Sequence, residues 1–318
     1  MTNPAVKNSG SDKPPPILVS GAHRSGTTWT AKMIAAHKDV AYISEPLNIY
    51  HRQGVLLAPT KYWYTYICHQ NEISLLPALR DTINFRYHLG AEIRSIKSLK
   101  DFLRMGRDLS TFALGRFRNQ LPLIKDPFAV FSAPWFHERL ACKVVIVVRH
   151  PAAFVSSLMR LNWSFDFSHL LDQSLLMRDL LEPFRDKMEE MHKNPDDILG
   201  QGALLWCMVY QTVQQFRGKF PHFILRRHED LALDPVKMFG EIYDALNLEY
   251  SPQVQAIVQK ASSTKNPTEL ANGNVHGIKL DSQKSIYNWK NRLNRQQIER
   301  VHILTQEVAS HYYPDEDW

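Results

Sequence analysis

Residues 17–29 read ILVSGAHRSGTTW, and this stretch decides the fold class. Its apolar start predicts a buried strand, and the composition from Trp29 to Ile34 predicts a helix. In the loop between them, free backbone N–H groups and the positive end of the helix converge on one point. The stretch therefore predicts an α/β protein with a cradle for a phosphate or a sulfate.

The cradle departs from the nucleoside-triphosphate P-loop at one position. Gly21 and Gly26 have the spacing of that motif, but Thr27 stands in the place of its lysine, so a triphosphate pocket would lack its main cation. The cation lies inside the loop instead, at Arg24. A P-loop kinase or NTPase acting on a small molecule, with Asp126 binding magnesium, is the alternative that these residues leave open.

A second strand predicts another contact with an anion. Residues 144–148, VVIVV, have the pattern of a strand buried on both faces, and Arg149 follows at its carboxyl end. Pro151 suits the first turn of a helix, and Ser157 lies about two turns further on. A guanidinium beside a hydroxyl would suit a phosphate dianion.

Both stretches resemble those of the sulfotransferases. Residues 24–29, RSGTTW, resemble the family's 5′-phosphosulfate loop, and Arg149 with Ser157 resembles its site for the 3′-phosphate. The resemblance implies a three-layer, P-loop-like α/β fold with a central, mostly parallel sheet. It also implies 3′-phosphoadenosine 5′-phosphosulfate (PAPS) as the donor and 3′-phosphoadenosine 5′-phosphate (PAP) as its product. The donor-binding residues that it implies are Arg24, Ser25, Gly26, Thr27, Thr28, Trp29, Arg149 and Ser157.

The same resemblance implies the catalytic groups. Residues 121–127, LPLIKDP, resemble the family's central strand, whose lysine lies near the transferred sulfate and corresponds to Lys125. Cytosolic members that act on small molecules continue with Thr and a catalytic His, whereas Asp126 and Pro127 stand here. This form is closer to tyrosylprotein, Golgi-type and bacterial members, several of which use a glutamate after the second strand. Glu45 has that position, and a carboxylate would accept the proton of an acceptor hydroxyl.

Other interpretations of Glu45 stay open. A helix cap, or a salt bridge to Arg24 or Lys125, would give it a structural role. Four histidines are rival bases because they lie near the motifs in the sequence: His23, His37, His51 and His150.

Two segments near the carboxyl end also resemble family elements. Residues 281–290 resemble the loop that closes over the 3′-phosphate, which makes Lys284 a candidate ligand, with Lys279, Lys290 and Arg292 as alternatives. Residues 223–231 resemble a strand and a Tyr-Glu-Asp-Leu turn with His228 in place of Tyr, a segment that bears on the fold and not on catalysis.

Length and composition fit one α/β domain over residues 17–318, preceded by a polar, proline-rich tail at 1–16 that we expect to be disordered. Helical insertions at about 50–119 and 162–220 should form a lid and an acceptor pocket. Tyr62, Trp63, Tyr64 and Tyr66 are expected mainly to pack. Six arginines are expected mainly on solvated helix faces: Arg86, Arg94, Arg104, Arg107, Arg116 and Arg118.

Charge and residue spacing narrow the partners. A net charge of +6 suits an anionic nucleotide, but no nucleic-acid motif is present. The three cysteines are far apart and the histidines lack metal-ligand spacing, so no metal is expected. No segment has the apolar length of a membrane span, which favours a soluble, cytoplasmic, bacterial-type enzyme.

The predicted reaction is sulfuryl transfer from PAPS to a hydroxyl or an amine. Such transfer depends on positioning and on stabilising charge at the leaving oxygen, which Arg24 and Lys125 would supply. The acceptor is unidentified, with a carbohydrate, lipid, peptide or secondary metabolite all admissible, and the oligomeric state is open. A non-catalytic nucleotide-binding relative is a further alternative.

Overall fold

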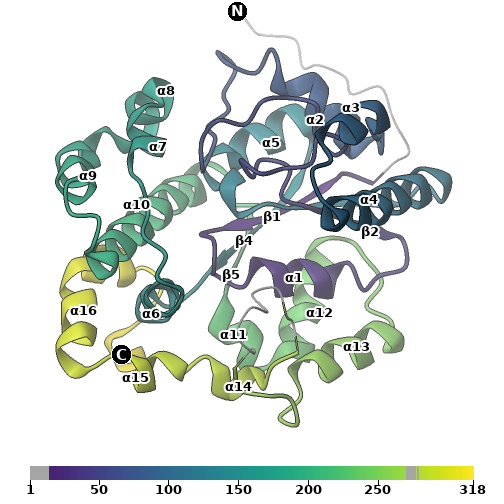
Figure 1. Cartoon of the computed structure of the whole chain (residues 1–318). Helices are drawn as coiled ribbons and strands as arrows, with labels where there is room; N and C mark the ends of the chain where they lie inside the picture. Colours follow the sequence, from purple (N-terminus) through teal and green to yellow (C-terminus); the bar gives the residue numbers. More distant parts are fainter. Residues whose placement is uncertain (1–13, 270–276, 278) are drawn as a thin grey trace, which may run out of the picture.

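The computed structural model describes residues 14–269, 277 and 279–318. Residues 1–13 of the expected tail lie outside this range. A five-stranded sheet with all strands parallel, in the order β2-β3-β1-β4-β5, occupies the centre (Figure 1). The expected α/β class is therefore confirmed. The strands are β1 (Ile17–Gly21), β2 (Val40–Ser44), β3 (Leu121–Lys125), β4 (Lys143–Val148) and β5 (Ile224–Arg227).

Strands β1, β3 and β4 form where the sequence is largely apolar, and they are covered on both faces. Every residue of β1 and β3 is buried, and only Lys143 at the start of β4 is partly exposed. Strands covered on both faces lack the alternating pattern of half-exposed strands. The register brings Gly21 beside Val147, and Ser44 beside Lys125, so the carboxyl ends of neighbouring strands lie at one edge.

Helices cover both faces of the sheet. On one face, Trp29 and Met33 pack against Phe239, Ile242 and Tyr243. The helices of this layer are α1 (Thr27–Ile34), α11 (His228–Leu233), α12 (Pro235–Ala245) and α13 (Pro252–Ser262).

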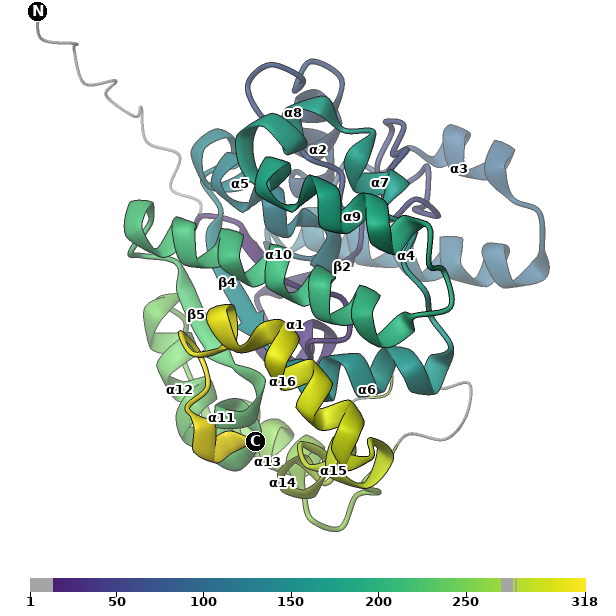
Figure 2. The same cartoon turned by 90° about the vertical axis from the view of Figure 1, so that its left-hand side faces the viewer.

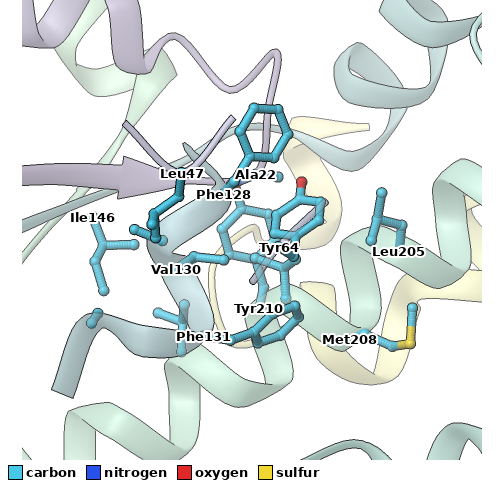
Figure 3. Packing of buried hydrophobic residues seen from close by; sticks show 14 of the residues in the cluster. Ala22, Leu47, Tyr64, Phe128, Val130, Phe131, Ile146, Leu205, Met208 and Tyr210 are labelled. Carbon is cyan, nitrogen blue, oxygen red and sulfur yellow. The ribbon is translucent and has the colours of Figure 1, made fainter. Parts of the chain in front are cut away.

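The opposite layer holds the larger core. Phe128, Phe131, Tyr64 and Tyr210 gather there in the packing shown in Figure 3. Helices α6, α10 and α16 lie close together on this side (Figure 2). The elements of this layer are η1 (Pro127–Ser132), α5 (Ala133–Leu140), α6 (Pro151–Leu161), α10 (Ile198–Lys219) and α16 (Arg295–Ala309).

The first insertion is only partly helical. Residues 50–74 contain turns and irregular backbone, so the expectation of a mostly helical segment is wrong for this part. Its aromatic and apolar side chains pack one by one into the core, as Tyr64 does, and Ser132 binds the backbone of Thr65 and Ile67. The helices that follow are α2 (Leu75–Ile83), α3 (Leu89–Ser95) and α4 (Leu99–Phe117).

The second insertion is largely helical, as expected. It contains α7 (Ser168–Leu171), α8 (Ser174–Leu176), the π-helical turn η2 (Met177–Leu181), η3 (Glu182–Phe184) and α9 (Arg185–His192), and it leads into α10. The chain ends with α14 (Ser282–Ser285), α15 (Asn288–Arg292), α16 and η4 (Asp315–Asp317). Among the described residues, no helix combines the length and the apolar character needed to cross a bilayer.

Candidate active site

The cradle between β1 and α1 requires both of its glycines. Gly21 has a φ of 145°, and a Cβ there would lie 2.4 Å from the Val147 carbonyl oxygen. Gly26 has a φ of 90° at the N-cap of α1, and its Cβ would lie 2.4 Å from Nδ1 of His228. A side chain at either position would be strained and would meet a neighbour. The loop therefore keeps its backbone exposed to a ligand.

A cavity, here called the cradle cavity, joins the two motifs singled out in the sequence. Seven of the expected donor-binding residues line it: Arg24, Gly26, Thr27, Thr28, Trp29, Arg149 and Ser157. Other lining residues come from distant parts of the chain, namely Arg160, His228, Asn288 and Arg292. A single cavity thus collects residues that follow β1, β4 and β5.

Hydrogen bonds link the motifs directly. Nη1 of Arg149 donates to the Arg24 carbonyl at 2.8 Å, and Nε of Arg24 donates to Oγ of Ser157 at 3.2 Å. Arg149 is partly buried, and its Nε is a buried atom with no hydrogen-bond partner within the described residues. A buried donor of this kind is costly unless something binds it. The arrangement suits a bound oxyanion.

The charges in the cradle cavity repel one another. Burial, followed by the charges of Arg149, Arg160 and Arg292, lowers the pKa of Arg24 to about 10. Arg24 therefore stays charged at neutral pH, although each of these guanidinium groups disfavours the others. Four converging cations match a ligand with several negative charges.

Ser25 has a different position from its neighbours in the loop. It is not among the residues that line the cradle cavity, and its Oγ lies 2.7 Å from the hydroxyl of Tyr210. Its N–H donates to the Ala22 carbonyl at 3.2 Å. Tyr210 also accepts the N–H of Ala22 at 3.3 Å and donates to the Val147 carbonyl at 3.0 Å. Ser25 and Tyr210 thus fasten the loop to α10 and β4.

Lys284 also lies outside this lining. Its side chain is 73% exposed, and its ammonium is 3.7 Å from the Asp281 carboxylate. Of the alternatives for this role, Arg292 lines the cavity, where it binds Glu269 at 2.5 Å. The structure brings Arg292, and not Lys284, to the other arginines.

Glu45 and Lys125 meet at the ends of β2 and β3. Their side chains form a salt bridge, and the Glu45 N–H donates to the Lys125 carbonyl at 2.7 Å. The second carboxylate oxygen of Glu45 accepts a hydrogen bond from Nδ2 of Asn48 at 2.8 Å. Glu45 has a φ of 48°, and Arg24 one of 63°, in the left-handed region that non-glycine residues rarely adopt. Such conformations concentrate at functional sites.

Asp126 organises this region from beneath. Its two carboxylate oxygens accept the N–H groups of Leu47 at 2.6 Å and Phe128 at 3.0 Å. Burial, and then the charge of Glu45, raises its pKa to about 7. Asp126 is fully buried, each of its oxygens accepts a backbone N–H, and it lines neither the cradle cavity nor the cavities beside Glu45, so its position does not favour the alternative of a magnesium ligand. Within the part of the chain that the structure describes, no three His, Cys, Asp or Glu side chains are grouped as metal ligands.

Two larger cavities meet at Glu45. The aromatic cavity, of about 490 Å³, contains Trp63, Phe128, Trp163 and Phe165. The basic cavity, of about 760 Å³, includes Lys125 and four further cations. Thr28 borders all three cavities, while Glu45, Asn48 and Tyr50 border the aromatic and the basic cavity. Thr28 therefore lies at the boundary between the cradle cavity and the two cavities that Glu45 borders.

The rival histidines divide into two groups. His37 and His150 line neither of the cavities that Glu45 borders. His150 instead caps α6 and stacks on Trp289, with ring centres 4.8 Å apart. His51 borders the basic cavity, 2.7 Å from the hydroxyl of Thr60. His23 borders the aromatic cavity, with Nδ1 2.7 Å from the hydroxyl of Tyr64, and burial lowers its pKa to about 4.

His228 is a site residue that the sequence interpretation did not identify. It lines the cradle cavity, its ring meets the edge of Trp29 at 5.5 Å, and burial lowers its pKa to about 3. The neutral ring has an Nδ1 without a hydrogen-bond partner in the described residues. Its place directly after β5 was the available signal, because ligands of open α/β sheets bind at the carboxyl ends of strands.

Comparison with known proteins identifies the family of the chain. The family model described as the sulfotransferase domain matches residues 14–312. A search of curated proteins finds no match.

Several solved structures are similar in fold. The sulfotransferase domain from the curacin biosynthetic pathway is 16% identical, with 94% of this chain and 98% of that one covered and a TM-score of 0.49. The sulfotransferase domain of the Synechococcus olefin synthase is 15% identical, with 96% of this chain and 97% of that one covered and a TM-score of 0.48. A mouse sulfotransferase complexed with PAP is 14% identical, with 95% of this chain and 87% of that one covered and a TM-score of 0.46. Because the family model spans nearly the whole chain, this protein belongs to the sulfotransferase domain family and is a PAPS-dependent sulfotransferase.

Proposed function

We propose that this enzyme binds PAPS in the cradle cavity and transfers the sulfuryl group to a hydroxyl that enters beside Glu45. One observation carries the proposal: the cradle cavity and the two cavities bordered by Glu45 share Thr28. A donor held by the cradle would present its sulfate where an acceptor in either of the other cavities reaches it.

The donor would be held by charge at both ends. Arg149, Ser157 and Arg292 would bind the 3′-phosphate, with Arg292 in place of Lys284. Arg24, Thr27, Thr28 and the backbone of Gly26 would bind the 5′-phosphosulfate. Ser25 would position the loop through Tyr210 and not contact the donor.

The adenine would lie near two rings. Trp29 and His228 both line the cradle cavity. Stacking of a base on an aromatic side chain is worth about 1–3 kcal/mol, and the unpartnered nitrogen of His228 offers a hydrogen bond to a ring edge.

Transfer would be in line. The S–O bond to the acceptor oxygen forms while the bond from sulfur to the 5′-phosphate oxygen breaks, the hydroxyl proton passes to Glu45, and PAP leaves. Glu45 forms an ion pair with Lys125, and a carboxylate is the form of the side chain that accepts a proton. Arg24, with the backbone N–H groups of the loop, would stabilise negative charge on the leaving phosphate. The scheme needs no metal ion.

Calorimetric titration with PAP tests the donor site. We expect tight binding to the wild type, at least tenfold weaker binding to Arg149→Ala, and little binding of ATP with magnesium. Arg86→Ala is a matched control, because Arg86 is exposed and pairs with Asp81 far from the cavity. Preference for ATP, or PAP binding that does not depend on Arg149, would overturn the proposal.

A further inference from the structure

The basic cavity is unusually rich in cations. Five basic side chains line it: Lys32, Arg52, Arg104, Arg107 and Lys125. Among the described residues, only two acidic side chains, Glu45 and Asp108, do so. A cavity of about 760 Å³ lies within the usual range for small-molecule sites of about 300–1,000 Å³. The space and the charge together suit an anionic molecule.

The helix α4 brings two of these cations to the site. We expected Arg104 and Arg107 on solvated helix faces, but α4 runs beside β2 (Figure 1), and both residues line the basic cavity. Their side chains are 59% and 64% exposed, so they form its outer rim. Guanidinium groups at a rim remain free to reorient toward a ligand.

Most of the cations already have acidic partners. Arg107 binds Asp108 at 2.7 Å, Arg104 lies 3.7 Å from Asp101, and Lys125 pairs with Glu45. Arg52 pairs with Glu92 and Asp101.

Lys32 differs from the others. Within the described residues it makes no salt bridge and no side-chain hydrogen bond, although it is partly buried. Burial, followed by the charges of Lys125 and Arg107, lowers the pKa of its ammonium. A partly buried cation that is repelled by two other cations is destabilising unless an anion joins it.

The position of Lys32 relates it to the transfer point. It lies one helical turn after Thr28 on α1, and residues four apart share a helix face. Thr28 borders the cradle cavity, and Glu45 lines the same cavity as Lys32. A molecule bound beside Lys32 would therefore lie next to the reacting groups.

We propose that the basic cavity binds an anionic group of the acceptor, held by Lys32 with Arg104 and Arg107, while the acceptor hydroxyl lies at Glu45. The acceptor class is a hydroxyl compound that carries a carboxylate, sulfate or phosphate ester. This inference rests on the proposed function, because it needs transfer to occur at Glu45.

Binding to the PAP-saturated enzyme tests the inference without knowledge of the natural acceptor. PAP fills the phosphate contacts of the cradle but leaves the place of the transferred sulfuryl group open, so the variants must distinguish that place from the basic cavity. The probes are matched 4-nitrophenyl glycosides: the β-glucoside, the β-glucuronide, and the 6-sulfate and 6-phosphate of the β-glucoside. We expect at least one charged member to bind tenfold or more tightly than the neutral glucoside.

The variants assign that preference to the cavity. Lys32→Met and the double variant Arg104→Ala, Arg107→Ala should each reduce the preference at least fivefold, whereas Lys32→Arg should keep most of it. Arg116→Ala is the control, because Arg116 lies on the same helix outside the basic cavity. Equal binding of charged and neutral probes, no binding of the charged probes, or a preference that survives Lys32→Met and the double variant would overturn the inference.

PAP affinity, measured in every variant, separates this inference from the proposed function. Normal PAP binding with no preference for anionic probes would reject the anionic acceptor alone. If the wild type does not bind PAP, the proposed donor site is wrong, and the inference that rests on it is rejected with it. Unchanged PAP affinity in Lys32→Met would also show that this variant is folded.

Discussion

At the scale of single residues, Glu45 combines an unfavourable backbone conformation with a position at the junction of two cavities. A non-glycine residue in the left-handed region costs on the order of 1–3 kcal/mol. Glu45→Gln keeps the side-chain volume and an acceptor for Asn48 but cannot take up a proton as a carboxylate does. We expect kcat to fall about 10²- to 10⁴-fold, with PAP affinity unchanged within twofold.

The Glu45 experiment uses transfer of labelled sulfate to the best acceptor found in a screen, together with PAP calorimetry. His23→Gln is the comparison, because His23 also borders the aromatic cavity. A larger loss of kcat in His23→Gln than in Glu45→Gln would move the base to His23. Equal loss of turnover and of PAP binding in Glu45→Gln would assign Glu45 to donor binding.

Gly26 tests whether the cradle tolerates a single methyl group. Gly26→Ala must place its Cβ 2.4 Å from Nδ1 of His228 and adopt a φ of 90°. We expect at least tenfold weaker PAP binding and a loss of about 1–3 kcal/mol in the free energy of unfolding. Gly218→Ala is the control, since nothing lies within 4 Å of its Cβ in α10, and it should stabilise by up to about 1 kcal/mol. Normal PAP affinity in Gly26→Ala would contradict the close fit between loop and ligand.

At the scale of elements, Asp126 joins β3 to the loop after β2 through its bond to Leu47, and it caps η1 through its bond to Phe128. Its pKa of about 7 lies above that of an unfolded aspartate, so the folded state binds the proton more tightly. The stabilisation by the neutral carboxyl is complete below about pH 4 and is lost as the pH rises through 7. The free energy of unfolding of the wild type, relative to Asp126→Asn, should fall by up to about 4 kcal/mol from pH 4 to 7.

Urea unfolding at a series of pH values measures this difference. Because both proteins share every other titrating group, the difference isolates Asp126. A difference that rises with pH would mean that the two backbone N–H groups outweigh burial and hold the carboxylate ionised. Asp126→Asn should also lower kcat more than PAP affinity, since Leu47 lies two residues from Glu45.

The elements that could be predicted from the sequence are those that a short stretch of neighbouring residues determines. Strands β1 and β4 are apolar runs, and the cradle follows from small residues between a strand and a helix, so short windows suffice. The loop at 50–74 was misjudged because its aromatic residues pack into the core singly, which periodicity does not distinguish from helix. His228 and Arg292 reach the cradle cavity only through the order of strands and the path of the last helices.

At the scale of the whole molecule, the sheet explains why residues so distant in sequence form one site. The cradle, Glu45, Arg149 and His228 each follow the carboxyl end of a different strand, and Lys125 is the last residue of β3. The parallel arrangement brings these ends to one edge. The helical layers cover that edge, where three cavities share Thr28 as a lining residue. Donor binding, transfer and acceptor binding would thus depend on the same strand register.

The four arginines that line the cradle cavity should affect the stability of the unliganded protein. Arg24, Arg149, Arg160 and Arg292 repel one another until an anion binds. Arg160→Ala should leave the unliganded protein as stable as the wild type or more so, because Arg160 is exposed and its charge opposes its neighbours. PAP at 100 times its Kd adds about 2.7 kcal/mol to the free energy of unfolding of the wild type. If Arg160→Ala binds PAP tenfold more weakly, the same concentration of PAP adds only about 1.4 kcal/mol to that of the variant.

Urea unfolding with and without PAP measures both effects of Arg160→Ala. Arg116→Ala is the control, because Arg116 is exposed and lies outside the cradle cavity. The control should show the full stabilisation by PAP. If Arg160→Ala destabilised the unliganded protein by more than about 1 kcal/mol and left the effect of PAP intact, Arg160 would be a structural residue. We expect instead that Arg160→Ala is at least as stable as the wild type without PAP and is stabilised less by PAP. That result would mean that the unliganded enzyme is less stable because its arginines are placed to bind a doubly phosphorylated donor.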